Sequence, residues 1–421
     1  MTSKRILFLG ITGVQKEKCI RRILDKYERD HRYIDFDSEY LFNSDKGGML
    51  KTSFLNMPVA LQFKAWRESW DLFLKENSKQ EPFDQLKDDI FLSLHGSIIR
   101  GHYGVRSVVD INRVIAFKPT FVFNLITDVY DMWWRTEQRA EGLDGPLIGQ
   151  PSLEQLICGR RFELIIGDQI ALSCNPKAKH LLMPIAHPIE TIIRSMSSKN
   201  IPIVYLSFPI SEPRRMQENG DNSGISAIND FINKAYQVQS KESDIAFICP
   251  LAIDELPLIK MPQLDDAGLT EVTFNRSLRW NLSSIWPEEK CIGDPTVITK
   301  PFPKNQILDA RGNINSDVSW RDYRLVEQSK CLAVFNPIFN NKDRPARSVQ
   351  NEINSVYSME GGRVAYIYQD PAHDNNNNYD KYYCKTTGGT MFPYPTENLH
   401  FRCSSIEKLF SDILDHCRKG G

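Results

Sequence analysis

The sequence predicts an α/β protein with mainly parallel sheets, arranged in two domains. Short apolar runs alternate with amphipathic segments along the chain, which is typical of strand–helix units that build parallel sheets. The length of 421 residues exceeds the roughly 250–300 residues at which single hydrophobic cores stop growing. A lysine-rich start and a Ser-Ser-Lys-Asn turn mark residues 177–200 as a hinge. We therefore expect one domain at residues 1–190 and a second at residues 200–421.

The individual elements follow from the spacing of the apolar residues. The expected strands are the apolar runs Arg5–Leu9, Tyr33–Phe36, Phe121–Ile126, Ile203–Phe208, Ile245–Cys249, Leu332–Phe335 and Val364–Tyr368. The expected amphipathic helices are Lys16–Lys26, Pro58–Lys75, Leu153–Leu172, Ile225–Gln237, Ser348–Met359 and Ile406–His416. This alternation predicts two Rossmann-like three-layer domains, in which a sheet lies between two layers of helices.

Composition restricts the classes of partner. The chain has 52 basic and 53 acidic residues, so its net charge favours neither nucleic acid nor an anionic membrane. No run approaches the roughly 18 apolar residues of a membrane span, and Ile6–Leu9 is too short for a signal-peptide core. The nine cysteines form no CxxC pair and show no metal-ligand spacing. We expect a cytoplasmic protein without a metal site or a membrane partner and with no clear nucleic-acid signal, although local basic clusters remain possible.

The first expected strand runs into an altered phosphate-binding loop. The full motif, GxxxxGK[ST], wraps phosphates in backbone N–H groups, while its lysine meets their charge and its hydroxyl binds Mg²⁺. Gly10, Gly13 and Lys16 of this motif are present. Gln15 replaces the glycine before the lysine, and Glu17 replaces the Ser or Thr. A carboxylate at that place would repel triphosphate oxygens, so the sequence argues against ATP–Mg²⁺ binding of the usual kind.

Further segments of residues 4–171 resemble adenylate-kinase-like P-loop kinases. The matching segments are Tyr33–Asp37, Leu94–Ser97, Gly101–Asp110 and Lys118–Asp128, and the arginines that match the family's lid and the helix after it are Arg135, Arg139, Arg160 and Arg161. The resemblance implies a pseudo-kinase domain whose nucleotide-binding residues are Gly10, Gly13, Lys16, Arg135 and Arg139. A purely structural α/β domain and an active kinase remain open alternatives.

Polar residues of the C-terminal half gather where its expected strands end. Asp322 lies on a polar segment before an apolar run, and Glu352 lies in the first turns of a helix that opens near Ser348. In open α/β sheets, ligands bind outside the carboxyl ends of the strands. We therefore expect Asp322, Ser348 and Glu352 to point toward a common site. Asp309 and Asp317 flank a Gly-Asn pair, and we expect both in a loop.

The order of the C-terminal segments resembles the nucleoside 2-deoxyribosyltransferase-like superfamily. The matching segments are Tyr205–Pro209, Phe247–Pro250, Asp322–Val334, Ser348–Glu352 and Gly362–Tyr366. The match covers about residues 203–369, with a long insert between Asp254 and Asp309. Two departures stand out. Lys330 occupies the place of the family's usual second aspartate, and Arg344 and Arg347 stand where glycines are common.

The resemblance implies a site that breaks an N-glycosidic bond. Cleavage develops positive charge on the sugar, which a carboxylate beneath the anomeric carbon stabilises or attacks. By resemblance Glu352 takes this catalytic role, and Asp322 orients the sugar hydroxyl or the carboxylate. A structural alternative for Glu352 is stabilisation of the helix dipole. The expected substrate-binding residues are Ser207, Pro209, Arg214, Arg215, Asn336, Arg347 and Ser348.

These features predict an N-glycosidase, or a base-exchanging ribosyl- or deoxyribosyltransferase, that acts on a nucleoside, a nucleotide or NAD. The alternatives are a nucleoside monophosphate kinase-like phosphotransferase and a non-enzymatic nucleotide sensor, for example in antiviral defence. The glycosidase reaction requires no cofactor, whereas the kinase alternative requires ATP and Mg²⁺. We expect the partner to be a small-molecule nucleoside or nucleotide. The resemblance also implies a homo-oligomer, because members of that family commonly complete their sites from neighbouring subunits.

Overall fold

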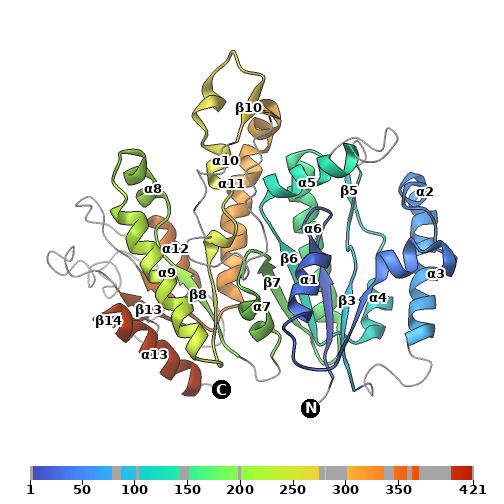
Figure 1. The fold of residues 1–421 in the computed structure, drawn as a ribbon, viewed down its shortest axis with the longest axis horizontal. Coiled ribbons are helices and arrows are strands. Elements are labelled where there is room, and N and C mark those ends of the chain that lie inside the picture. The colour runs from blue at the N-terminus through green and yellow to red at the C-terminus, as the bar shows by residue number, and fades with distance from the viewer. Residues whose placement is uncertain are drawn as a thin grey trace. The chain divides into compact units, whose positions relative to one another are not determined.

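The structure, a computed structural model, describes most of the chain. The described residues are 3–77, 87–100, 104–141, 151–197, 201–274, 280, 301–335, 346–357, 363–368 and 400–419. They form two compact units (Figure 1). The first comprises the described residues of Met1–Ile189, Ala252–Trp280 and Cys291–Val318, and the second those of Glu190–Leu251 and Ser319–Gly421. Each unit is built on a five-stranded parallel sheet, which confirms the predicted α/β class with mainly parallel sheets.

The sheet of the first unit has the strand order β2-β3-β1-β6-β7, and all its neighbouring pairs are parallel. Its strands are β1 (Arg5–Leu9), β2 (His31–Asp35), β3 (Asp89–Ser93), β6 (Phe121–Ile126) and β7 (Lys179–Pro184). β3 and β6 are buried along their whole length, as expected of central parallel strands covered on both faces. The expected strands do not include β3 or β7, and β7 falls in the expected hinge.

The first unit also contains helices and short antiparallel strands. The helices are α1 (Lys16–Leu24), α2 (Lys51–Asn56), α3 (Val59–Asn77), α4 (Ile111–Val114), α5 (Val129–Glu141), α6 (Leu153–Ser173), α10 (Leu256–Ile259) and the first part of α11 (Lys304–Glu327). The antiparallel pairs are β4 (Ile98–Arg100) with β5 (Gly104–Arg106), and β10 (Glu271–Thr273) with β11 (Pro301–Pro303). Short helical turns occur at Asp37–Leu41, Ser44–Lys46, Ile115–Phe117, Pro250–Ala252 and Pro262–Asp265.

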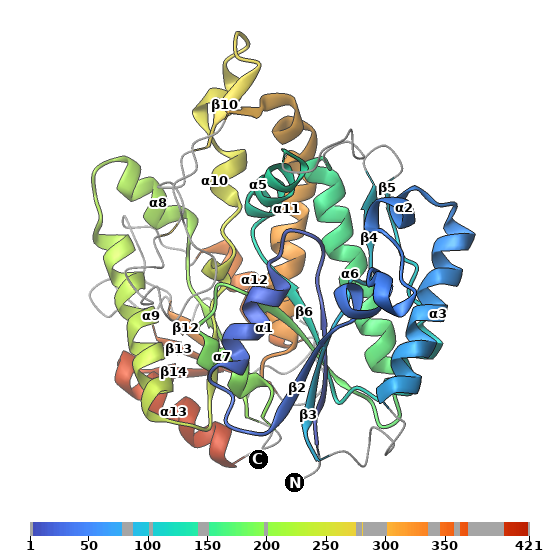
Figure 2. The same ribbon diagram turned by 45° about the vertical axis from the view of Figure 1, so that its right-hand side comes forward.

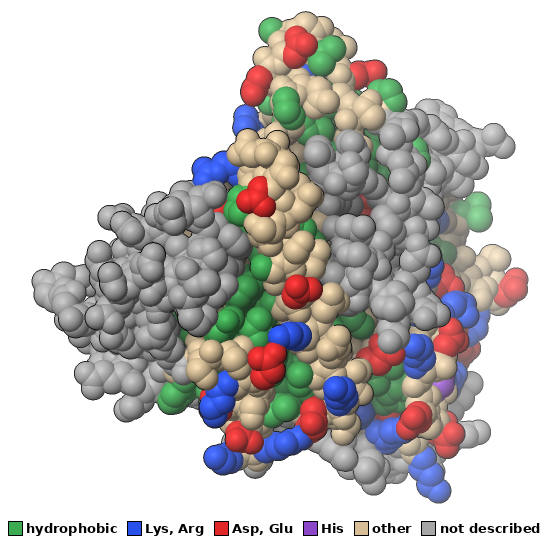
Figure 3. All heavy atoms as spheres, turned by 60° about the vertical axis from the view of Figure 1, so that its left-hand side comes forward, with side chains coloured by type: hydrophobic (Ala, Val, Ile, Leu, Met, Phe, Trp, Pro, Cys, Tyr) green, Lys and Arg blue, Asp and Glu red, His purple; other side chains and the backbone are tan. Residues whose placement is uncertain are grey.

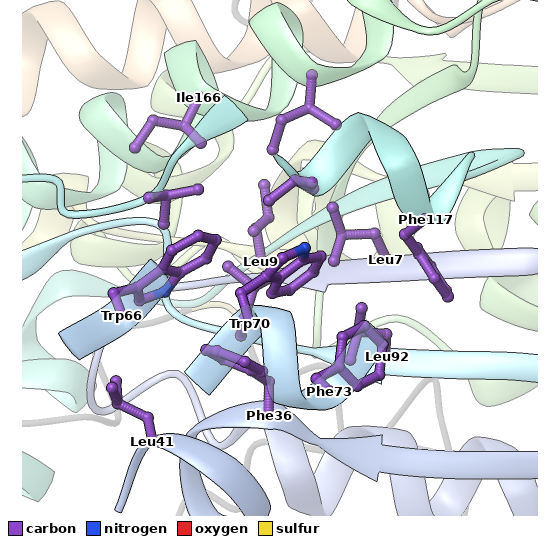
Figure 4. Packing of buried hydrophobic residues seen from close by; sticks show 14 of the residues in the cluster. Leu7, Leu9, Phe36, Leu41, Trp66, Trp70, Phe73, Leu92, Phe117 and Ile166 are labelled. Atoms are coloured by element: carbon purple, nitrogen blue, oxygen red, sulfur yellow. The ribbon is translucent and has the colours of Figure 1, made fainter. Parts of the chain in front are cut away.

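An aromatic cluster holds α3 against one face of the first sheet. The indole rings of Trp66 and Trp70 stack with their centroids 5.1 Å apart, and the ring of Phe36 lies 5.0 Å from that of Trp70. Leu7 and Leu92, from the neighbouring strands β1 and β3, belong to the same buried cluster (Figure 4). Aromatic pairs of this kind stabilise beyond their buried area. The position of α3 is therefore fixed by its own apolar face.

Part of the predicted insert packs within the first unit. The ring of Phe302 lies 4.1 Å from that of Trp133, and the ring of Phe274 lies 4.8 Å from that of Tyr130. Both partners lie on α5. These contacts bury aromatic rings of the described parts of Ala252–Val318 against α5.

The sheet of the second unit has the strand order β14-β13-β12-β8-β9, and its pairs are likewise parallel. Its strands are β8 (Ile203–Ser207), β9 (Ala246–Ile248), β12 (Cys331–Phe335), β13 (Val364–Tyr368) and β14 (His400–Cys403). Read from the other edge and numbered by chain order, this is 2-1-3-4-5, the flavodoxin-like order of doubly wound sheets. Ligands in such sheets bind outside the carboxyl ends of the strands, at the switch point between the first and third strands, here β8 and β12.

The helices of the second unit are α7 (Ile189–Ser195), α8 (Ser211–Glu218), α9 (Ser223–Lys241), α12 (Arg347–Tyr357), α13 (Ile406–Lys419) and the last part of α11. Of these, α9, α12 and α13 contact its strands. On one face, the ring of Phe231 on α9 lies 5.1 Å from that of Phe335 on β12 and 5.6 Å from that of Phe410 on α13. Figure 2 shows α9 and α13 beside the strands of this sheet. Helix α12 contacts β12 and β13 from the other face, where its side chains reach β8.

Candidate functional site

Strand β8 presents two hydroxyl side chains at its carboxyl end. Tyr205 and Ser207 are two residues apart, so their side chains point to the same face of the sheet. Both residues are fully buried. The strand ends at Ser207, and the buried Pro209 follows it closely; a proline has no N–H with which to continue a strand ladder. The two hydroxyls therefore lie next to the switch point of this sheet.

Helix α12 places the Glu352 carboxyl group on these hydroxyls. Val349 and Ile353 are fully buried and lie three residues before and one residue after Glu352, so the apolar face of α12 directs Glu352 toward the sheet. Tyr205 Oη donates to Glu352 Oε1 over 3.0 Å, and Ser207 Oγ donates to Oε2 over 2.5 Å. Glu352 is only 8% exposed. Both carboxyl oxygens are thus held by protein donors in a dry environment.

Burial and a second carboxylate control the protonation of Glu352. The pKa of Glu352 is raised from 4.5 to about 8, chiefly by burial and then by the charge of Asp322, while the hydrogen bonds from Ser207 and Tyr205 act in the opposite direction. Burial, followed by the charges of Glu352 and Asp322, also raises the pKa of Tyr205 well above its ordinary value. At neutral pH, Glu352 is therefore mostly protonated and Tyr205 stays a phenol.

Asp322 shares the electrostatic environment of Glu352. Its side chain, on the last turns of α11, is 17% exposed, and the Arg321 guanidinium lies 3.2 Å from its Oδ1. Arg321 itself is 3% exposed. Both predicted catalytic residues, Asp322 and Glu352, therefore lie close enough for the charge of Asp322 to act on Glu352. We call Tyr205, Ser207, Asp322 and Glu352 the Glu352 site.

The other predicted substrate-binding residues differ in exposure, and some lie outside the described residues. Arg214 is half-buried on α8, and Arg215, on the same helix, is exposed and forms an ion pair with Glu212. Ser348 is exposed, one turn before Glu352 on α12. Asn336 and the side chain of Arg347 lie outside the described residues.

The site residues predicted from the sequence do not include Tyr205. It belongs to the matching segment Tyr205–Pro209, but no catalytic or binding role is predicted for it. The signal was present in the sequence, since Tyr205 and Ser207 are separated by one residue in a predicted strand, a spacing that puts both side chains on one face. What the sequence does not reveal is which helix covers that face.

In the first unit, the Lys16 side chain is bound by the backbone around the loop. Its Nζ donates to the carbonyl oxygen of Leu94 over 2.5 Å and to that of Gly10 over 3.3 Å. Burial lowers the pKa of Lys16, while the charges of Asp37 and Glu163 oppose that change. The lysine is therefore satisfied by carbonyls and nearby carboxylates of its own unit.

The loop keeps the backbone shape of a tight turn despite its altered residues. Gly13 has φ +88°, and a Cβ there would lie 2.8 Å from the carbonyl oxygen of Met132, so only glycine fits. Gln15 adopts φ 62°, a left-handed conformation that favours glycine, the residue it replaces. The Glu17 side chain is exposed and pairs with Arg21 over 2.8 Å. Its carboxylate thus points to solvent and not into the loop.

Two further carboxylates sit near Lys16. Glu163 accepts hydrogen bonds from the backbone N–H groups of Gly96 (3.0 Å) and Ser97 (2.8 Å). Asp37 accepts from the backbone N–H of His95 over 3.0 Å, and their side chains lie 2.6 Å apart. These contacts balance the buried charges within the unit.

The predicted nucleotide-binding arginines are partly accounted for by contacts within the first unit. Arg135 donates to the carbonyl oxygen of Gly13 over 2.9 Å. The side chain of Arg139 lies outside the described residues. Arg160, buried, forms ion pairs with Glu255 (2.7 Å) and with Asp317.

The loop expected around Asp309 and Asp317 is wrong. Both residues lie within the helix α11, and Asp317 is fully buried there. The Gly312-Asn313 pair is typical of a turn, but the helix continues through it. A Cβ on Gly312 would meet no atom within 4 Å, so the helix does not require a glycine at this position. Asp317 accepts from Arg160 and, over 2.6 Å, from Arg161. These ion pairs compensate the propensity lost at the glycine.

The described surface and helices add little to the choice of partner. Basic and acidic side chains are interspersed over the described part of the face in Figure 3, and exposed ion pairs such as Lys234–Glu407 and Arg418–Glu242 occur on the second unit. Among the described helices, none combines the length and hydropathy needed to cross a bilayer. Within the same residues, no three His, Cys, Asp or Glu side chains are grouped to hold a metal ion.

Comparison with models of known protein families and with curated proteins finds no match to this chain. The choice of site therefore depends on geometry. The Glu352 site combines a carboxyl group of perturbed pKa, two hydroxyl donors and a second carboxylate at the carboxyl end of a parallel sheet. Titratable groups with a pKa perturbed by burial and a nearby charge are candidates for a functional site.

Proposed function

We propose that this chain is an N-glycosidase, which hydrolyses the bond between a base and a sugar, with Glu352 as the catalytic residue. The observation that carries the proposal is the Glu352 carboxyl group, buried and held by Tyr205 and Ser207 beside the switch point of the second sheet. A carboxyl group that served only the helix dipole would need neither burial nor two side-chain donors. Transfer of the sugar from one base to another is the related reaction, in which a second base takes the place of water.

The proposed reaction has two balanced steps. Ionised Glu352 attacks the anomeric carbon of the sugar, the bond from that carbon to the base nitrogen breaks, and the base leaves with the bonding electron pair; a base that leaves as an anion then takes a proton from solvent. Water then attacks the anomeric carbon of the glycosyl ester, giving its proton to solvent, and the Glu352 carboxylate leaves. The products are free base and free sugar. Asp322 stabilises the positive charge that develops on the sugar ring.

Tyr205 and Ser207 hold the carboxylate for attack. Both donate to Glu352, so they favour its ionised form and fix both of its oxygens. Ser348, Arg214 and the loop at Pro209 are the parts of the described chain that we propose to contact the sugar and its substituents. Phosphoryl transfer by the first unit is not proposed, because Lys16 donates to two carbonyls and the hydroxyl that would bind Mg²⁺ is absent at Glu17.

The test is release of free base. The full chain is incubated with nucleosides, nucleoside 5′-monophosphates and NAD, and free base is followed by chromatography. Glu352→Gln, which keeps the shape of the side chain but cannot attack, is expected to abolish release. Glu218→Gln, an exposed change on α8, is the matched control and is expected to leave it intact. If no base appears across the panel, or if Glu352→Gln releases base at the wild-type rate, the proposal is wrong.

A further inference from the structure

Two cysteines of the second unit lie between its sheet and its last helix. Cys331 is the first residue of β12, and Cys417 lies in the last turn of α13. Both are free thiols, and they are 0% and 8% exposed, respectively. Ser207 of the Glu352 site pairs with Val334, near the opposite end of β12, so the two thiols are separate from the proposed glycosidase chemistry.

The sheet directs Cys331 toward the layer that contains α13. Side chains of a strand alternate between its two faces, so Cys331 and Phe335 point the same way. The ring of Phe335 stacks on that of Phe231 of α9, 5.1 Å away, and Phe231 also stacks on Phe410 of α13. The thiol of Cys331 therefore faces the side of the sheet on which α9 and α13 pack.

The helix α13 brings Cys417 to the same place. Ile413 and Cys417 are one turn apart and both buried, so they belong to the stripe of α13 that faces the sheet. The next residue, Arg418, forms an ion pair with Asp244 over 3.2 Å, just before β9 begins. The last turn of α13 thus lies at the end of the sheet where the strands begin, which is also where Cys331 opens β12.

The two thiols act on each other. The hydrogen bond between them raises the pKa of Cys331, and burial acts in the same direction. The same bond lowers the pKa of Cys417; burial and the charge of Asp244 oppose this, while the charge of Lys330 supports it. The thiolate is the nucleophilic form of cysteine. Cys417 is therefore the member of the pair suited to attack, and Cys331 is the member placed to react with it.

We infer that Cys331 and Cys417 are a modification site, a dithiol that a hydroperoxide oxidises to an intramolecular disulfide joining β12 to α13. The Cys417 thiolate attacks an oxygen of the hydroperoxide, the O–O bond breaks, and the leaving alkoxide or hydroxide takes the proton that Cys417 released. Cys417 is then a sulfenic acid. The Cys331 sulfur attacks the Cys417 sulfur, the S–O bond breaks, and hydroxide leaves with the Cys331 proton as water. The two thiols are oxidised, and the hydroperoxide is reduced.

The experiment follows the bridge in the full chain. Reduced protein is treated with hydrogen peroxide, the remaining thiols are alkylated in denaturant, and linked peptides are identified by digestion and mass spectrometry. We expect one bridge, between Cys331 and Cys417, which dithiothreitol reverses. Cys417→Ser should abolish it. Cys158→Ser, which removes an exposed thiol on α6, is the control and should leave the yield unchanged.

A second measurement needs no variant. The same oxidation in concentrated urea removes the packing of α13 on β12, and all nine cysteines then compete for one another. The yield of the Cys331–Cys417 bridge should therefore fall by roughly tenfold, since loop closure favours no distant pair. Equal yields in the two conditions would overturn the inference. So would a bridge from Cys417 to Cys403 in the folded chain, or the absence of any bridge at Cys331.

Discussion

The Ser207 hydroxyl donates to Glu352 Oε2 over 2.5 Å, and this contact joins the last residue of β8 to the middle of α12. The two residues are 145 positions apart in the chain. Doubly wound topology makes the contact possible, since it brings the helix after the third strand beside the end of the first. The most direct predictions concern this bond and its carboxyl group.

Ser207→Ala should move the pH profile of base release upward. The Ser207 hydrogen bond lowers the pKa of Glu352, so its loss raises that pKa further above about 8. Because the attacking form is the carboxylate, the acid limb of kcat/KM should shift up by about one unit. Kinetics between pH 5 and 9 check this, with Ser211→Ala at the exposed start of α8 as control. A fall in rate without any shift of the limb would contradict it.

Glu352 should make the protein less stable as pH rises. Its folded-state pKa of about 8 exceeds its ordinary 4.5, so the folded state binds more protons than the unfolded state between these values. The stability is fully present below pH 4.5 and is lost as pH rises through about 8, by an amount on the order of 3–5 kcal/mol. Glu352→Gln removes the titrating group, so the variant's stability should gain on wild type as pH increases.

Urea unfolding of wild type and Glu352→Gln from pH 5 to 9 measures this difference. Other titrating groups cancel in it, since they are common to both proteins. Glu218→Gln, exposed on the same unit, should follow the wild-type curve. A constant difference across the range would show that Glu352 has an ordinary pKa, and the electrostatic account of the site would be wrong.

The central strands of the second unit were predictable because they are buried on both faces. Cys331–Phe335 and Val364–Tyr368 are continuous apolar runs bounded by polar residues, which is the pattern of such strands. The pairing of Asp322 with Glu352 followed from segment order rather than from any single motif. The role of Tyr205 did not follow, because its partner is set by strand order and by which helix covers that face.

In the first unit, the strand β7 and the helical position of Asp317 were not predicted either, because both depend on contacts distant in the sequence. The strand β7 begins with Lys179 and His180, whose polarity conceals an apolar run of four residues. Asp317 lies beside a Gly-Asn pair typical of turns, yet the long helix α11 continues through it. Its ion pairs with Arg160 and Arg161 join residues about 156 positions apart. Contacts this distant cannot be predicted from the helix propensity of the local sequence.

Trp70→Ala should destabilise the first unit strongly. Trp70 is fully buried between Trp66 and Phe73. Truncation leaves a cavity that the sheet and α3 cannot close, so we expect a loss of about 3–5 kcal/mol in the free energy of unfolding. Leu61→Ala, on the exposed side of the same helix, should change it by less than about 0.5 kcal/mol. Denaturant unfolding measures both changes. If the two variants lose the same free energy of unfolding, α3 does not bury the face that contains Trp70.

Arg160→Met should lower the free energy of unfolding more than the simultaneous removal of Arg160, Glu255 and Asp317 as charged groups. The single change leaves Glu255 and Asp317 buried without their cation, which we expect to cost about 3–5 kcal/mol. Adding Glu255→Gln and Asp317→Asn removes those charges, while the new amide oxygen can still accept from the backbone N–H of Val129 as the Glu255 carboxylate does. The triple variant should therefore recover most of the loss in urea unfolding. If it unfolds as readily as Arg160→Met alone, the cost arises from packing around the arginine stem and not from unpaired buried charge.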